Sequence, residues 1–156
     1  MQNSKIKKKI ITLIGPTACN KTSTAVHLIK KFPISIIGVD SVQIYKRFNI
    51  GSAKPPIEIL EKYKHHLVDS ADPENIFSVK DFYDQAYRIV LQAHSNNRIP
   101  LLVGGTMMYF NALFKGINDI PEGNEAIREE LQRELDNRGV DKLFNELKEI
   151  DPESAK

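Results

Sequence analysis

The sequence is poor in cysteine, with Cys19 as its single thiol among 156 residues. One thiol cannot build an internal disulfide framework, which excludes the class of small secreted domains that disulfides hold together. A lone cysteine suits a reducing compartment, and we therefore expect the protein to be cytoplasmic.

Long hydrophobic runs are also missing. The apolar stretch that follows Lys9 is about five residues long, whereas a membrane-spanning helix needs about 20. It is short for a signal peptide as well. We expect no membrane association, and we interpret residues 5–9 as a solvated lead-in to a strand.

An excess of charge of one sign is the third absence, since 22 basic and 20 acidic residues leave a formal net charge of +2. This balance neither requires nor excludes a nucleic-acid partner, because a local basic face can exist within a balanced total. The 41% hydrophobic and 27% charged content is that of an ordinary globular protein, long enough for one domain with a core.

Strand-like and helix-like segments alternate between residues 9 and 116. Short apolar runs predict buried strands at 9–15, 34–40 and 99–105 and a shorter strand at 65–69. Apolar residues at helical spacing predict helices over 21–32, within 77–100 and over 106–116. This alternation predicts an α/β fold with a parallel sheet flanked by helices.

The helix within 77–100 carries the clearest pattern. Ser78, with Asp81 three residues later, is typical of a capping box at a helix start. The predicted apolar stripe consists of Phe82, Ala86, Ile89 and Ala93.

The composition changes after residue 116. Gly116 predicts a helix end, and residues 124–156 are charged, with two amphipathic helices separated by Gly139. We expect an α/β core over 1–116 and the start of a helical insertion domain over 117–156. Its arginines, including Arg128, lie among glutamates, which predicts surface ion pairs.

The segment LIGPTACNKTSTAV, residues 13–26, resembles a phosphate-binding loop of the form G-x-x-x-x-G-K-[ST]. Gly15, Lys21 and Thr22 stand at the required positions, between a predicted strand and a predicted helix. In such loops backbone N–H groups and a Lys hold the phosphates, and the hydroxyl after the Lys binds Mg²⁺. The other interpretation is a strand-to-helix turn that Thr22 caps.

Asn20 departs from this motif, which has glycine there. Glycine tolerates backbone conformations that are costly for other residues, and Asn is the best substitute in a left-handed conformation. We therefore predict a genuine but weakened phosphate-binding loop.

Further candidates follow later strands. Asp40 ends the second strand and should face the same crevice as the loop, as a general base, as a water-mediated Mg²⁺ ligand or only as a turn former. Thr106, after Gly104 and Gly105, should direct its hydroxyl into the crevice while capping a helix. Lys54 is predicted either to contact phosphate or to be solvated.

Several strings occur together in order: GPTACNKT, VDSVQIYKRFNIGSAKP, HHLVD, FSVKDF and RIPLLVGGTMMYFNAL. They resemble the bacterial tRNA dimethylallyltransferase family over residues 9 to about 130. The resemblance implies a P-loop NTPase-like fold. It also implies transfer of a dimethylallyl group from dimethylallyl diphosphate to N6 of the adenine immediately 3′ of the tRNA anticodon, with Mg²⁺ as cofactor.

The resemblance also implies residue roles. Asp40 would remove the N6 proton, and Thr106 and Lys21 would assist catalysis. The diphosphate would be bound by Gly15, Pro16, Thr17, Ala18, Cys19, Asn20, Lys21 and Thr22, with Thr22 also at the metal. The tRNA would contact Asp40, Ser41, Val42, Gln43, Thr106 and Arg128.

Family members are considerably longer than this chain, so the resemblance implies a truncated member, a monomer if complete. Two alternatives remain open. One is a small-molecule P-loop kinase, suggested by Lys21, Thr22 and Asp40, and the other is a catalytically inactive fragment.

Overall fold

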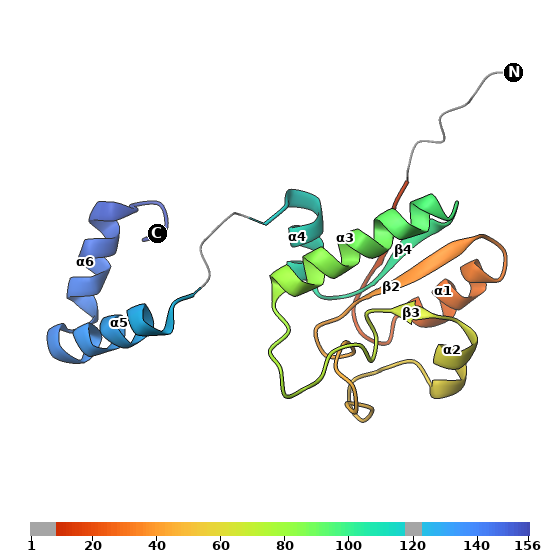
Figure 1. Ribbon diagram of the computed structural model, residues 1–156, viewed down its shortest axis with the longest axis horizontal. Helices are drawn as coiled ribbons and strands as arrows, with labels where there is room; N and C mark the ends of the chain where they lie inside the picture. The colour runs from red at the N-terminus through yellow and green to blue at the C-terminus, as the bar shows by residue number, and fades with distance from the viewer. Residues whose placement is uncertain (1–8, 118–122) are drawn as a thin grey trace, which may run out of the picture. The chain divides into compact units, whose positions relative to one another are not determined.

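The computed structural model describes residues 9–117 and 123–156. The predicted lead-in at residues 5–8 and the segment 118–122 lie outside the described residues. The chain divides into two compact units, residues 1–117 and 118–156. In chain order, the first unit contains β1 (Ile11–Ile14), α1 (Lys21–Ile29), β2 (Ile34–Val39), α2 (Ile57–Lys62), β3 (His65–His66), α3 (Val79–Ser95), β4 (Ile99–Gly104) and α4 (Met107–Lys115) (Figure 1).

The first unit is built on a four-stranded parallel sheet with the strand order β1-β4-β2-β3. In register, Leu101 of β4 lies beside Ile11 of β1 on one side and Ile36 of β2 on the other. Because these strands are parallel, the carboxyl ends of β1, β4 and β2 meet at one edge of the sheet. The predicted α/β fold with a parallel sheet is confirmed.

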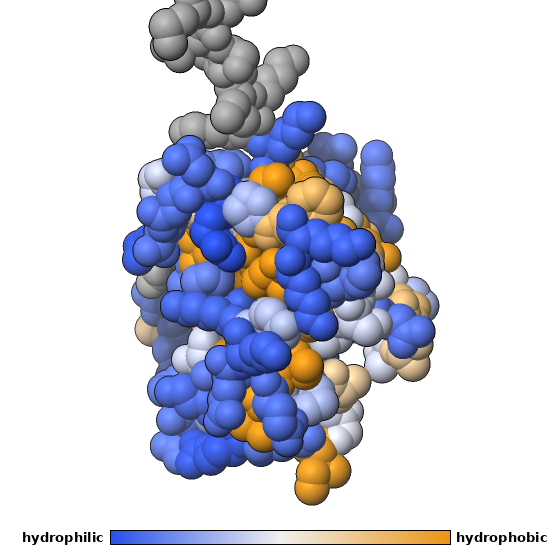
Figure 2. Space-filling view, turned by 90° about the vertical axis from the view of Figure 1, so that its right-hand side faces the viewer, coloured by the Kyte–Doolittle hydropathy of each residue, from blue (hydrophilic) through white to orange (hydrophobic). Residues whose placement is uncertain are grey.

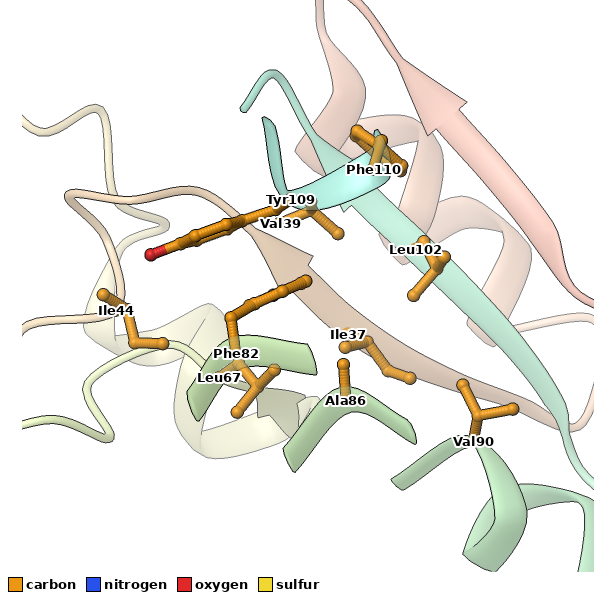
Figure 3. Packing of buried hydrophobic residues seen from close by; sticks show 10 residues of the cluster. All are labelled: Ile37, Val39, Ile44, Leu67, Phe82, Ala86, Val90, Leu102, Tyr109 and Phe110. Carbon is orange, nitrogen blue, oxygen red and sulfur yellow. The ribbon is translucent and has the colours of Figure 1, made fainter. Parts of the chain in front are cut away.

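Helices cover both faces of the sheet, with α1 on one face and α3 and α4 on the other (Figure 1). Successive residues of a strand point to opposite faces, so Ile36 packs with Ala25 of α1 while Ile37 packs against α3. The larger core cluster comprises Ile37, Val39, Ile44, Leu67, Phe82, Ala86, Val90, Leu102, Tyr109 and Phe110 (Figure 3). The sheet is thereby held rigidly between two helical layers.

The start of α3 confirms the predicted capping box. The Ser78 hydroxyl accepts a hydrogen bond from the Asp81 N–H at 3.1 Å, and the Asp81 carboxylate accepts one from the Ser78 N–H at 2.9 Å. Hydrogen bonds from Ser78, first from its side chain and then from its backbone, lower the pKa of Asp81. The predicted stripe needs one correction, because Val90 is buried with Phe82 whereas Ile89 is only partly buried at its margin.

β1 differs from the expectation of a buried strand. Ile11 and Ile14 are 43% and 44% exposed. The reason is topological, since β1 stands at the end of the strand order and pairs only with β4 among the described strands. A run of branched apolar residues predicts a strand, but not its place in the sheet.

α4 ends at a glycine, as predicted, since Gly116 has a φ of 83°. Four apolar residues begin this helix. Tyr109 and Phe110 are buried, whereas Met107 and Met108 are exposed. α2 was not predicted, because this helix is only six residues long, follows two prolines and has no clear apolar periodicity.

The second unit contains α5 (Glu125–Arg138) and α6 (Val140–Ile150), separated as predicted by Gly139 with a φ of 78°. Arg138 pairs with Glu134 at 3.0 Å and with Glu146 at 2.7 Å. Within residues 9–117 and 123–156, no helix is both long and apolar enough to cross a membrane.

Candidate functional site

The loop between β1 and α1 has the backbone of an anion-binding turn. Ala18 and Asn20 both have left-handed conformations, with φ of 65° and 60°. Alternation of this kind turns successive N–H groups toward one concave side, where the amino end of α1 adds its partial positive charge. A β-carbon at Gly15 would lie 2.7 Å from the Cys19 Sγ, so a larger residue at the entry would displace the Cys19 side chain.

Asn20 has the left-handed backbone that the sequence predicts, so its side chain does not prevent the loop from forming. It makes no side-chain capping bond to α1, and the alternative of a cap by Thr22 is not what the structure has, since Thr22 lies inside the helix.

This conformation leads to a stability prediction. We expect Asn20→Ala to lower the free energy of unfolding by about 1 kcal/mol, because alanine lacks the local bonding that makes the left-handed region tolerable for Asn. Asn20→Gly should change it by less. Thermal or urea unfolding measures both, and Asn111→Ala, in the exposed helical part of α4, is the matched control that should not destabilise. Equal effects at positions 20 and 111 would contradict the prediction.

Lys21 is the first residue of α1, and its side chain turns back over the loop. The ammonium donates to the carbonyl oxygens of Gly15 at 2.8 Å and Pro16 at 2.5 Å, and lies 3.6 Å from the Cys19 Sγ. The positive charge is therefore held at the mouth of the turn, where it is available to an anion that replaces these neutral acceptors.

Asp40 follows β2 and forms a turn with the residues after it. Its Oδ1 accepts hydrogen bonds from the N–H groups of Val42 at 2.9 Å and Gln43 at 3.1 Å. Among the described residues Oδ2 has no hydrogen-bond partner, so one carboxylate oxygen is oriented by the backbone and the other is free for chemistry. The turn-forming interpretation of Asp40 and its functional interpretation are compatible.

Thr106 joins the ends of β4 and β2. Its Oγ1 accepts a hydrogen bond from the Ser41 N–H at 3.0 Å and lies 3.5 Å from the Ser41 hydroxyl. Although Thr106 is the residue before α4, its side chain does not cap the helix, so that part of the prediction is wrong. The hydroxyl is engaged by Ser41 instead, because Gly105 and Thr106 both donate backbone hydrogen bonds to Val39 and bring the two strand ends together.

This contact yields a second prediction. We expect Thr106→Val to cost about 1 kcal/mol of stability, since the Ser41 N–H loses its acceptor, whereas Thr106→Ser should retain the bond and cost less. Unfolding of both variants in urea provides the comparison. A valine variant as stable as the serine variant would remove Thr106 from its positioning role.

The Lys21 loop and Asp40 border one cavity of about 590 Å³ in the first unit. The described residues that line it are Thr17, Ala18, Cys19, Asn20, Lys21, Thr22, Ser23, Val26, His27, Lys30, Asp40, Gln43, Ser52, Ala53, Pro56, Ile59, Val103 and Gly104. Lys21 and Asp40 thus face the same space at the carboxyl edge of the sheet, where ligands bind in open α/β folds.

Not every predicted site residue lines this cavity. Gly15 and Pro16 contribute backbone carbonyls to Lys21, and Ser41, Val42 and Thr106 lie outside the lining although they are bonded to it through the Asp40 turn. Arg128 belongs to the second unit, where its guanidinium packs beside Gly123.

Two residues that line the cavity, Ser52 and Ala53, were not predicted from the sequence. The Gln43 amide donates to their carbonyl oxygens at 3.1 and 3.0 Å. The adjacent Lys54 is not solvated, and it is not among the residues that line the cavity. Its ammonium is buried and pairs with Asp69 at 2.6 Å while donating to Tyr45 O at 2.9 Å, which braces the loop.

The cavity offers oxygen atoms for a hard cation but no ready-made protein cage. No group of three or more His, Cys, Asp or Glu side chains capable of holding a metal occurs among the described residues. Thr22 and Asp40 both line the cavity. In the described part of the chain, neither the Thr22 hydroxyl nor the Asp40 Oδ2 has a hydrogen-bond partner. This donor set fits Mg²⁺, which binds through few protein oxygens together with water and substrate phosphates.

The sequence model of the IPP transferase family matches residues 43–156, well over half of the chain. The chain belongs to the IPP transferase family. Among its curated relatives, the tRNA dimethylallyltransferase of Dichelobacter nodosus is 44% identical over 146 residues, which cover 94% of this chain and 46% of that protein. The tRNA dimethylallyltransferase of Legionella pneumophila is also 44% identical, over 96% of this chain and 48% of the relative.

Solved structures support the same assignment. The tRNA isopentenylpyrophosphate transferase of Bacillus halodurans is 39% identical with a TM-score of 0.69, over 96% of this chain and 50% of that one. A eukaryotic dimethylallyltransferase acting on tRNA is 27% identical with a TM-score of 0.78, over 95% and 37%. The fold is thus the P-loop NTPase-like fold of IPP transferases, and this chain spans about half the length of the relatives it matches.

Proposed function

We propose that this chain carries the donor-binding and base-activating part of an enzyme that transfers a dimethylallyl group from dimethylallyl diphosphate to tRNA. The acceptor is N6 of the adenine immediately 3′ of the anticodon. The observation that carries the proposal is the shared cavity, which is lined by both the Lys21 loop and Asp40. Membership of a family whose relatives are named for this reaction supports it.

The chemistry requires a new bond from N6 to C1 of the dimethylallyl group while the bond from C1 to the diphosphate oxygen breaks. The developing charge is on the leaving diphosphate. The loop amides and the Lys21 ammonium stabilise it, since preorganised donors lower the barrier where charge develops. Lys21 exchanges its bonds to the Gly15 and Pro16 carbonyls for bonds to phosphate oxygens.

The proton of the attacking amine goes to Asp40. An exocyclic amine is a poor nucleophile, so a positioned carboxylate is effective as a general base. The backbone bonds to Oδ1 hold the carboxylate, which leaves Oδ2 to accept the proton. The adenine must leave its stack in the tRNA to reach Oδ2, and this unstacking costs about a few kcal/mol of binding free energy.

Mg²⁺ is the cofactor that we propose, and Thr22 is the residue that would hold it. When bound, it neutralises charge on the diphosphate oxygens. The two units correspond in this proposal to a catalytic core over 1–116 and a helical insertion over 117–156 whose Arg128 contacts the tRNA. We further propose a monomer that acts in the cytoplasm.

The test is a transfer assay with purified chain, radiolabelled dimethylallyl diphosphate, Mg²⁺ and unmodified tRNA. The expected result is label in RNA that digests to N6-dimethylallyl adenosine. Donor binding without transfer would identify a catalytically inactive fragment. Tight binding of ATP with none of dimethylallyl diphosphate would instead favour the kinase alternative.

A further inference from the structure

A second cavity, of about 400 Å³, lies at the opposite end of the sheet from the first. It is lined by Ile29, Ile34, Ser35, Lys62, Tyr63, Lys64, His66, Ile89, Gln92, Ala93, Asn96 and Arg98. Ile34 begins β2 and Arg98 directly precedes β4, so the cavity opens at the amino ends of these strands. Both strands are six residues long, which separates it from the Asp40 cavity by about 20 Å.

Three permanent cations line this second cavity, which we call the basic cavity, and no carboxylate is among its lining residues in the described part of the chain. Lys62 and Lys64 are exposed and form no ion pair with any described carboxylate. This concentration contrasts with a chain whose overall charge is only +2.

Arg98 is the arginine among the residues that line the basic cavity. Its guanidinium donates to the Ser35 hydroxyl at 2.9 Å and to the Ile34 carbonyl oxygen. Both acceptors are formally neutral, so these bonds orient the guanidinium without cancelling its charge. An arginine fixed in this way is suited to a phosphate, which its planar donors match.

The pKa of a neighbouring histidine is affected by the same cations. Burial first, and then the charges of Lys64 and Arg98, lower the pKa of His66, which keeps this side chain neutral at pH 7. A neutral imidazole can donate one hydrogen bond in addition to those of the Gln92 and Asn96 amides at the rim.

The positive surface also extends beyond the cavity. Tyr63 has the Lys62 ammonium 5.8 Å and the Lys30 ammonium 6.0 Å from its ring centroid. Lys30 follows α1, Lys62 ends α2 and Arg98 precedes β4, so the cations come from separate elements and form an extended surface. The side of the molecule on which these strands begin is predominantly hydrophilic (Figure 2). An extended array of cations with an aromatic ring among them is typical of a surface that follows a polynucleotide backbone.

We propose that the basic cavity binds the phosphate backbone of an RNA, with one phosphate at Arg98 and its neighbours at Lys62 and Lys64. The identity of that RNA as tRNA rests on the proposed function, whereas the phosphate chemistry rests on the charges alone. The site is separate from the cavity that holds the reacting groups. It contributes binding that is independent of base sequence, because phosphate contacts position an RNA without reading it.

The first experiment measures binding of a fluorescein-labelled anticodon stem-loop RNA to the full chain by anisotropy over a range of salt concentrations. We expect the double variant Lys62→Gln, Lys64→Gln to bind about tenfold more weakly at low salt, with the salt slope reduced by about 1 to 2. The matched control is Lys115→Gln, Lys148→Gln, which removes the same charge from the last turns of α4 and α6. Equal losses in the two double variants would overturn the proposal.

The second experiment needs no variant. Lysine acetylation of the wild-type chain, read by mass spectrometry, should show Lys62 and Lys64 protected by the RNA and Lys115 not protected. Protection of the same lysines by inorganic diphosphate but not by RNA would identify a small-anion site and reject the proposal. Transfer activity is scored separately, so a chain that shows lysine protection but no transfer would refute the proposed function and leave this site intact.

Discussion

Replacing Lys21 by methionine is expected to abolish tight binding of dimethylallyl diphosphate and to reduce transfer by at least about 100-fold. Among the described residues, the Lys21 ammonium is the one positively charged group that donates hydrogen bonds to the loop carbonyls. Removing a preorganised charge at a developing anion costs about 3 to 4 kcal/mol. Methionine keeps the length and the apolar stem, so the packing of the first turn of α1 should be retained.

Calorimetry with the donor and the transfer assay measure this effect together. Lys31→Met, which removes an exposed cation just beyond the end of α1, is the matched control and should behave like the wild type. If Lys21→Met bound the donor as tightly as Lys31→Met did, the loop would not be the diphosphate site.

Asp40→Asn is expected to lower the transfer rate by about 100-fold to 10,000-fold while donor binding stays within about twofold of the wild type. Asparagine retains an Oδ1 that can accept both backbone hydrogen bonds, from Val42 and Gln43, so the turn should persist. What disappears is the basic oxygen that takes the N6 proton. Asp40→Asn should therefore slow transfer without weakening donor binding, whereas Lys21→Met should impair both.

Single-turnover transfer, with the enzyme–donor complex in excess over tRNA, measures the rate of transfer separately from donor affinity. The control is Asp151→Asn, because Asp151 accepts backbone hydrogen bonds from Glu153 and Ser154 in the same kind of turn but lies in the second unit. An Asp40→Asn enzyme with unchanged single-turnover rate would exclude Asp40 as the base and leave it as a turn former.

Local patterns were reliable where the cause of a structure is local. The Ser78 capping box, the helix ends at Gly116 and Gly139 and the left-handed backbone of Asn20 all depend on interactions within a few residues, and each has the structure predicted. The roles of the predicted site residues stay predictions that the assays above test.

Expectations failed where distant segments decide. The predicted solvation or phosphate contact of Lys54 gave way to a buried pair with Asp69, fifteen residues away in the chain. Thr106 bonds Ser41 rather than its own helix because β4 lies beside β2. The basic cavity was not predicted at all, since its cations come from separate segments and only the fold gathers them.

The sequence by itself determined the phosphate-loop motif, the parallel α/β class and the resemblance to one family, because spacing and hydrophobic periodicity are properties of neighbouring residues. Only the tertiary structure decided that β4 lies between β1 and β2. The sequence had already placed Asp40 at the same crevice as the loop, and Lys21 and Asp40 do line one cavity. Strand order follows from how the two faces of the sheet bury their apolar residues against α1, α3 and α4, and that packing is a property of the whole fold.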